Sequence, residues 1–191
     1  GSPGLTPFYA ISPLSGITRR VGPNVAVHYS RGMLVGSPVP ARAFTLPGGV
    51  GAGLRAEYFN NRTLSGPPAL IRTDAQIQDD WNTVSPDPSL PRTNFSARWT
   101  GNLVAPVTGH YTLTLTADDG CRLFLDGKQL INHWIDGRES PQSAEVDLVA
   151  GQSYALRVEY YQAAREATAR LDWTLPSMSR FGEAVEAARA S

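Results

Sequence analysis

The stretch TGHYTLTLTADDG, residues 108–120, decides the fold class of this chain. From Tyr111 to Thr116 an apolar residue alternates with a threonine. A period of two, built from aromatic, β-branched and leucine side chains, is typical of an antiparallel strand that buries one of its faces. The sequence therefore predicts a half-buried strand that runs into Asp118-Asp119-Gly120 at its end.

The same period recurs on both sides of this strand. Further strands are expected at Leu54–Phe59 and at residues 95–105, 122–125, 145–149, 153–161 and 167–173. Asp126-Gly127 is a strong hairpin signal, because both central residues of a tight two-residue turn favour positive φ. About eight short strands with regular turns predict an all-β protein, an antiparallel β-sandwich. Residues 74–94, which contain three prolines, are expected to form a long irregular loop, a kind of segment that is often functional.

Both ends of the chain follow a different pattern. Residues 1–35 predict a short α/β segment, with a helix that starts at Ser12-Pro13 and a strand at residues 24–30. Residues 177–191 predict a helix with one apolar stripe from Phe181 to Ala188. Residues 36–52 are rich in glycine and proline and are expected to be a linker, with the sandwich at 53–176. Neither flank can bury its apolar side alone, so we expect the chain to be a piece of a larger protein.

Charge and cysteine content exclude several classes of function. The chain has 17 basic and 17 acidic residues, so it has no cationic field for nucleic acid, and no basic run suggests a membrane surface. Cys121 is the one cysteine and is expected to be a small buried apolar residue. No charged-then-apolar leader opens this segment, and both a secreted and a cytoplasmic parent stay open.

An ordered set of motifs extends the argument beyond periodicity. GLRAEYFN (53–60), FSARWTG (95–101), RLFLDGKQLINHW (122–134), LVAGQSYALRVEYY (148–161) and ATARLDWTLP (167–176) occur in this order. Together with the stretch at 108–120 they resemble the protective-antigen-type, or PA-fourteen, domain over residues 53–176. The resemblance implies a jelly-roll-like β-sandwich that is associated with carbohydrate.

The flanks resemble a second family. PFYAISPLSGITRRVGPNVAVHYSRGM (7–33) and SRFGEAVEAARAS (179–191) resemble the α/β-sandwich domain of a family 3 glycoside hydrolase, in which PA-fourteen domains occur as insertions. The resemblance implies an accessory domain of a β-glucosidase-like host. Its partners would be the remainder of that host and a glycoside substrate, and its role would be to shape substrate access and specificity.

Hydrolysis by this chain alone is not expected. A retaining glycosidase needs two carboxyl groups about 5 Å apart across the scissile bond. The resemblance places both of these groups in other parts of the parent. Asp118 and Asp119 are adjacent, and neighbouring side chains on an extended backbone point to opposite faces.

The same aspartates have two further interpretations. In sugar-binding adhesins that the chain resembles, the matching pair is joined by a cis peptide bond and binds calcium, which takes sugar hydroxyls as ligands. Calcium accepts about six to eight oxygen ligands. Those relatives add an asparagine from the loop at residues 160–167, where this chain offers Gln162, Arg165 and Glu166. The alternative is a plain turn, in which aspartate bonds its own backbone and glycine permits positive φ.

Tryptophans complete the candidate site, because their flat faces suit the apolar faces of sugar rings. Trp99 and Trp173 lie inside alternating strands and are expected in the core. Trp134, followed by Trp81, stands at a strand–loop junction and is the expected sugar platform. The predicted carbohydrate-binding residues are Trp134, Trp81, Asp118, Asp119, Gln162 and Arg165, with Asp118 and Asp119 as candidate calcium ligands. The alternative function is an independent calcium-dependent, lectin-like glycan-binding module.

Overall fold

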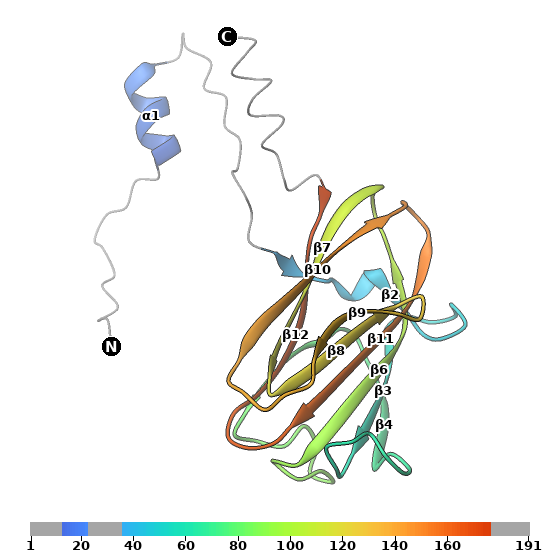
Figure 1. Ribbon diagram of the computed structural model, residues 1–191. Coiled ribbons are helices and arrows are strands. Elements are labelled where there is room, and N and C mark those ends of the chain that lie inside the picture. The colour runs from blue at the N-terminus through green and yellow to red at the C-terminus, as the bar shows by residue number, and fades with distance from the viewer. Residues whose placement is uncertain (1–12, 23–35, 177–191) are drawn as a thin grey trace. The chain divides into compact units, whose positions relative to one another are not determined.

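The computed structural model describes residues 13–22 and 36–176, which fall into two separate units (Figure 1). The first unit contributes helix α1 (Pro13–Val21), which begins at the predicted proline and is followed by Gly22 with φ of 77°. The strand expected at 24–30 and the helix expected at 177–191 lie outside the described residues. Within the described ranges no helix is long and apolar enough to cross a membrane.

The second unit is an antiparallel β-sandwich, as predicted. Its five-stranded sheet has the order β1-β12-β7-β10, and β5 also pairs with β12, on the side that β1 occupies farther along the strand. These strands are β1 (Ser37–Pro38), β5 (Gln78–Asn82), β7 (Gly109–Asp118), β10 (Ser140–Leu148) and β12 (Ala167–Thr174). The seven-stranded sheet has the order β4-β3-β6-β11-β8-β9, with β2 beside β6. Its strands are β2 (Phe44–Thr45), β3 (Leu54–Phe59), β4 (Leu70–Asp74), β6 (Phe95–Val104), β8 (Gly120–Leu125), β9 (Lys128–His133) and β11 (Ser153–Gln162).

Strands with a clear apolar alternation lie where the sequence predicts them. The hairpin between β8 and β9 also forms as predicted, with φ of 48° at Asp126 and 78° at Gly127. The expected irregular loop at 74–94 is shorter than predicted, because β5 pairs with β12 within it. Four of the five residues of β5 (QDDWN) are polar, so an alternation of apolar and polar residues is missing there.

Residues 36–52 do not behave as a free linker. In β1, Ser37 pairs with Trp173, and in β2, Phe44 pairs with Leu103. Val39 and Phe44 are fully buried. These strands of two residues are too short to show a period, which is why the glycine and proline content dominated the prediction. The pairing of β1 with β12 also places the two ends of the described sandwich side by side.

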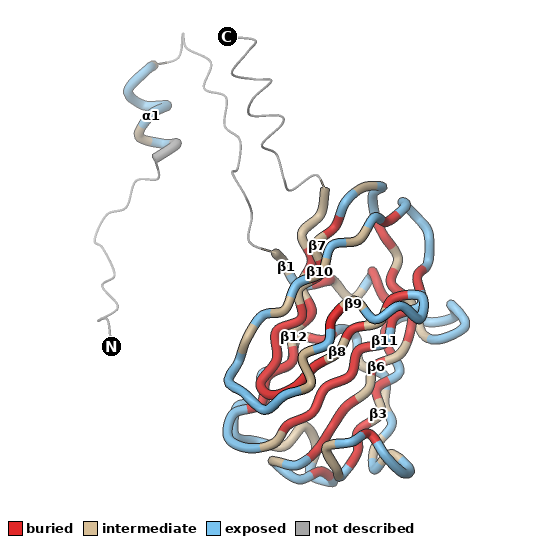
Figure 2. Tube along the Cα trace, in the orientation of Figure 1, coloured by how far each residue is buried: buried red, intermediate tan, exposed pale blue. Residues whose placement is uncertain are grey.

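The core lies between the two sheets, where Figure 2 shows the buried stretches of the strands. An aromatic cluster fills one part of this core. The Tyr160 ring lies 5.6 Å from Trp81, 5.9 Å from Phe95 and 6.5 Å from Trp99, measured between ring centroids. Cys121 is fully buried as expected, and burial raises the pKa of its thiol to about 12.

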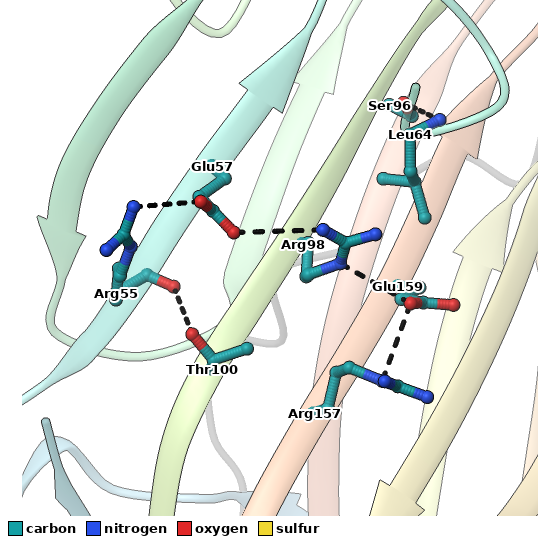
Figure 3. A network of polar contacts seen from close by, with 8 residues as sticks. All are labelled: Arg55, Glu57, Leu64, Ser96, Arg98, Thr100, Arg157 and Glu159. Carbon is teal, nitrogen blue, oxygen red and sulfur yellow. Dashed lines mark hydrogen bonds and ion pairs between the residues drawn. The ribbon is translucent and has the colours of Figure 1, made fainter. Parts of the chain in front are cut away.

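A row of opposite charges crosses the outer face of the seven-stranded sheet (Figure 3). Glu57, Arg98 and Glu159 are direct cross-strand partners on β3, β6 and β11. Arg98 lies 3.9 Å from Glu57 and 3.4 Å from Glu159, and Arg157 lies 3.4 Å from Glu159. Directly opposed charges favour one pairing over its one-residue slips, so this row supports the strand register.

Gly101 offers a test of whether β2 is a structural part of the sandwich. A Cβ at this position would lie 2.6 Å from the Thr45 carbonyl oxygen and 2.7 Å from Leu54 Cδ2. We predict that Gly101→Ala destabilises the fold by about 1–3 kcal/mol, because β2 must move away. Thermal unfolding would show a loss of several degrees. Gly137→Ala, whose Cβ meets nothing within 4 Å, is the control. Equal melting temperatures for both variants would contradict a packed β2.

Candidate functional site

The candidate site lies at the end of the sandwich that is remote from the paired chain ends (Figure 1). This loop end is formed by the segments that connect strands there, at residues 60–69, 83–94, 134–139 and 163–166, and by the junction of β7 and β8. All five connections lie at the same end of the sandwich, so residues that are distant in sequence lie close together there. The position is typical of binding loops carried by a rigid scaffold.

Asp118 and Asp119 form the junction of β7 and β8. The peptide bond between them is cis, as the resemblance to the adhesins implies. Only 8% of Asp118 and 6% of Asp119 is exposed, and both line one pocket. The expectation that they point to opposite faces is therefore wrong. That rule applies within a continuous strand, whereas β7 ends at Asp118 and β8 begins at Gly120.

The two carboxylates hold two loops by accepting backbone hydrogen bonds. The Glu139 N–H donates to Asp118 Oδ2 at 3.0 Å, and the Gly137 N–H donates to Asp119 Oδ1 at 2.9 Å. Asp119 Oδ2 accepts from the N–H of Ala163 at 2.7 Å and of Ala164 at 3.4 Å. Hydrogen bonds to an ionised acceptor are stronger than those between neutral groups, so the pair clamps residues 137–139 and 163–164 together.

Gly120 has a different role from the one the plain-turn interpretation gives it. It has no positive φ, and the aspartates before it accept hydrogen bonds from distant loops rather than from their own backbone. A Cβ at Gly120 would lie 2.0 Å from Cε1 of Tyr161, the residue paired with it on β11. The glycine is needed because the Tyr161 ring lies against the backbone.

The pocket above the aspartates has a volume of about 730 Å³ and a mostly charged wall. It is lined by Asp118, Asp119, Asp136, Gly137, Arg138, Glu139, Ala163, Ala164, Arg165 and Glu166. Burial raises the pKa of the Asp118 carboxyl, and the neighbouring charge of Asp119 raises it further. Within the described residues neither Arg138 nor Arg165 makes an ion pair, so both guanidinium groups are available to a ligand.

Two predicted site residues lie elsewhere. Gln162 is fully buried, and its side-chain amide donates to the Glu166 carbonyl at 2.8 Å, so it stabilises the loop from inside. Trp81 is 8% exposed and packs edge-on against Tyr58 and Phe95 in the core. Alternation could not place Trp81, because the polar strand β5 around it shows none. Of the six predicted residues the structure brings Asp118, Asp119 and Arg165 into one pocket.

Trp134 lies in a second pocket of about 520 Å³, beside the first. This pocket is lined by Arg62, Thr63, Trp134, Ile135, Asp136 and Tyr161. Asp136 lines both pockets and accepts a hydrogen bond of 2.6 Å from the Tyr161 hydroxyl. Sequence reasoning missed Arg62 and Asp136. Their ion pair joins residues 74 positions apart, which leaves no local pattern to find.

The side chains of this site supply too few oxygen ligands to hold a calcium ion by themselves. Asp118 and Asp119 supply two carboxylates, and the described part of the chain has no group of three His, Cys, Asp or Glu side chains that could hold a metal ion. Both oxygens of Asp119 already accept N–H bonds. A calcium ion with six to eight oxygen ligands would fit here only if backbone carbonyls, water and ligand hydroxyls supplied most of them.

Tyr160 connects the site to the core. Its hydroxyl lies 2.5 Å from the Asp118 carbonyl oxygen and 3.0 Å from Gln162 Oε1. Burial raises the pKa of this hydroxyl far above its usual range, which favours its protonated, hydrogen-bond-donating form. Because β11 and β7 belong to different sheets, the bond crosses the sandwich and fixes the backbone of Asp118.

We predict that Tyr160→Phe lowers stability by about 1–3 kcal/mol, since it keeps the ring and leaves the Asp118 carbonyl without its buried donor. The melting temperature should fall by about 2–4 °C per kcal/mol for a domain of this size. Amide hydrogen exchange at Gly137, Glu139 and Ala163 should accelerate more than exchange in β6. Uniform acceleration across the sandwich would show that the bond supports the core in general and not the loop clamp.

Comparison with known proteins agrees with this architecture. The PA14 domain matches residues 51–184. The anti-sigma-I factor RsgI3 of Acetivibrio thermocellus is 36% identical over 144 residues, which are 75% of this chain and 22% of that protein. A probable beta-glucosidase K of Aspergillus fumigatus is 29% identical over 174 residues, which are 84% of this chain and 22% of that protein. The chain thus spans about a fifth of the length of these relatives.

Solved structures show the same fold. A beta-glucosidase from Kluyveromyces marxianus superimposes with a TM-score of 0.57 at 21% identity, over 98% of this chain and 25% of that one. The PA14 sugar-binding domain of an RTX adhesin superimposes with a TM-score of 0.52 at 16% identity, over 64% of this chain and 89% of that one. With a family match across most of the sandwich, the chain belongs to the PA14 domain family.

Proposed function

We propose that this chain is a carbohydrate-associated accessory domain of a β-glucosidase-like glycoside hydrolase of family 3. In this proposal its loop end selects which glycosides reach the host's active site, and it carries out no hydrolysis alone. Support comes from the PA14 match and from relatives that are named beta-glucosidases and align over most of the chain. The similarity extends beyond the sandwich, since the aligned stretch covers 84% of the chain in one relative.

The observation that carries the proposal is the position of the two ends of the sandwich. β1 and β12 are paired, Ser37 with Trp173, so the chain enters and leaves at one place. A domain whose ends lie close together can be inserted into a host with little change to the host's own chain. The candidate loops lie at the opposite end, where they are free to face a ligand (Figure 1).

The chemistry of the loop end suits carbohydrate. Its pockets combine carboxylates, an indole ring and two guanidinium groups that have no ion-pair partner in the described part of the chain. Sugar hydroxyls both donate and accept hydrogen bonds, and a few fixed polar groups beside an apolar surface are typical of small-molecule sites. Contacts made at a distance from the reacting bond can set specificity without taking part in the chemistry.

The aspartate pair is poorly suited to catalysis. A nucleophile needs a free oxygen directed at the sugar, whereas both oxygens of Asp119 accept backbone N–H bonds. Asp118 accepts one such bond and is almost fully buried. We therefore expect no turnover of aryl β-glycosides by the isolated chain. Hydrolysis that is lost on Asp118→Ala would contradict this part of the proposal.

The role in specificity can be measured in the full-length parent. We predict that Arg138→Gln with Arg165→Gln lowers kcat/KM for β-linked oligosaccharides about three- to tenfold, the equivalent of one or two lost hydrogen bonds. The kcat for a small aryl β-glucoside should stay unchanged. Arg42→Gln, an exposed arginine at the opposite end, is the matched control. The proposal would be refuted if the wild type, the double variant and the control had the same substrate preference, and if removal of residues 36–176 did not change that preference.

One observation favours a second candidate function, an independent calcium-dependent glycan-binding module. The two carboxylates line one pocket, and the resemblance to the adhesins implies that the matching pair binds calcium. In that case Asp118 and Asp119 would hold the ion, and the ion would offer open positions to sugar hydroxyls. The side-chain donors fall short of a full set, which is why this function stands second.

Calcium titration separates the two functions. The second candidate predicts that calcium added to chelator-treated protein raises the melting temperature, and that glycan binding disappears with chelator. Asp118→Asn should abolish the calcium effect, because it removes one of two carboxylate ligands. Neither heat nor a shift in melting temperature at millimolar calcium would exclude it. The accessory-domain proposal does not depend on this outcome.

A further inference from the structure

We propose that protonation of Asp79 controls the loop at residues 83–94. With Asp79 protonated, Arg72 donates to the Pro86 carbonyl and holds this loop against the sandwich. With Asp79 ionised, Arg72 turns towards the new charge and releases the loop. The segment 83–94 is one of the connections that form the loop end, so the proposal adds a dependence on pH to the candidate site. It goes beyond the proposed function and requires no sugar.

Asp79 lies on the polar strand β5 and faces the core. Alternate residues of a strand share a face, and Trp81, two positions along, is buried. The residue paired with Asp79 on β12 is Ala169, which is buried as well. Asp79 Oδ2 is buried and has no hydrogen-bond partner within the described residues. A buried carboxylate oxygen without a donor is costly, so this position disfavours the charged form of Asp79.

The neighbouring carboxylate, Asp74 of β4, is already supplied with donors. The Tyr58 hydroxyl donates to Asp74 Oδ2 at 2.6 Å, and Trp99 Nε1 donates to the same oxygen at 2.9 Å. Arg72 Nε donates to Asp74 Oδ1 at 2.6 Å and pairs with its charge. In the described part of the chain Asp79 makes no ion pair. Ionisation of Asp79 would therefore place a second negative charge beside a cation that is already paired.

The surroundings raise the pKa of the Asp79 carboxyl to about 7. Burial is the largest cause, the charge of Asp74 adds to it, and the charge of Arg72 opposes it. The charge of Asp79 also reaches the hydroxyls of Tyr58 and Tyr160, whose pKa values are raised mainly by burial. Asp79 is thus surrounded by groups from β3, β4 and β11 that respond to its charge.

The other acidic groups nearby have different positions. Asp80, the next residue of β5, has a side chain that is 61% exposed on the opposite face. Asp87 of the loop faces Arg72, and hydrogen bonds from Ser89 lower the pKa of Asp87. Asp118 and Asp119 act on Tyr160 from the loop end. Near neutral pH Asp87 therefore stays ionised, while the charge of Asp79 changes.

Arg72 connects this charge to the loop. Its Nη1 donates to the Pro86 carbonyl at 3.3 Å, and its Nη2 donates to the Tyr58 hydroxyl at 2.8 Å. With the bond of 2.6 Å to Asp74, these are the hydrogen bonds of Arg72 within the described residues. The contact with Pro86 is the longest of them and is therefore the weakest. It is the contact that Arg72 loses first when a second carboxylate attracts it.

The loop is built to respond as a unit. The Ser85 hydroxyl lies 2.6 Å from the Asp87 carbonyl oxygen and 2.8 Å from the Leu90 carbonyl oxygen. The Leu90 N–H donates to the Asp87 carbonyl at 3.0 Å, and the Val84 N–H donates to the Trp81 carbonyl at 2.9 Å. These bonds join both ends of the segment, so a change at one carbonyl is passed to the whole loop.

The experiment titrates the full chain from about pH 4 to about pH 9 and follows two carbon signals by NMR. The signals are the side-chain carboxyl of Asp79 and the backbone carbonyl of Pro86. Both should shift with one midpoint near pH 7. Asp79→Asn, which cannot ionise, should abolish the shift at Pro86. Asp80→Asn, an exposed neighbour on the same strand, is the matched control and should keep it.

Melting curves give a second readout. The pKa of folded Asp79 lies above its ordinary value, so protonation stabilises the fold fully below about pH 4, and this contribution is lost as the pH rises through about 7. Asp79→Asn should melt at about the same temperature as the wild type at low pH and several degrees higher at about pH 8. Asp80→Asn should follow the wild type. A wild type and an Asp79→Asn variant with parallel melting temperatures at every pH would contradict the proposal.

The NMR outcomes are equally decisive. An Asp79 carboxyl that titrates in the ordinary range of aspartate overturns the proposal. A Pro86 signal that stays fixed while Asp79 titrates overturns it too, because Arg72 would then not connect the two. A Pro86 shift that persists in Asp79→Asn assigns the effect to another group. None of these measurements uses a sugar, so their failure is distinct from a failure of the accessory-domain proposal.

Discussion

The hydrogen bond from the Tyr160 hydroxyl to the Asp118 carbonyl is the interaction on which the loop end depends. The Tyr160 ring lies in the aromatic core beside Trp81, and the Tyr160 hydroxyl donates to the backbone of the opposite sheet. Once Asp118 is fixed, its carboxylate and that of Asp119 can hold the loops at 137–139 and 163–164. The packing of the core thereby positions a site that is built mainly from loops.

The rest of the sandwich keeps the paired chain ends apart from the candidate site. Paired strands β1 and β12 bring both chain ends to one end, while five connections assemble the pockets at the other. The charge row of Glu57, Arg98 and Glu159 supports the register of the sheet between them. A rigid frame of this kind lets the loops vary in sequence without loss of the fold, because their backbone is held by side chains of the frame.

Much of the fold follows from local pattern. Strands β3, β6, β7, β11 and β12 alternate clearly and lie where predicted, whereas the shorter or more polar strands β1, β2, β4 and β5 were missed. In the site, residue type and resemblance identified Asp118, Asp119 and Trp134. They could not show that Trp81 packs inward, that Gln162 is buried, or that Arg62 meets Asp136. Each of these depends on contacts between segments that are distant in sequence, and these contacts leave no periodic signal.

The difference between Asp118–Asp119 and Asp136 shows how one residue type takes two roles. The adjacent pair is buried and occupied with backbone N–H groups, so its charge is used for loop structure. Asp136 projects from the loop that this pair holds, with a side chain that is 59% exposed and one oxygen open. Loss of the buried pair would remove the bonds that hold the backbone of Gly137 and Glu139, whereas loss of Asp136 would remove the contacts with Arg62 and Tyr161 and keep those backbone bonds. The aspartate best suited to contact a sugar is therefore not one of the two that the sequence motif makes conspicuous.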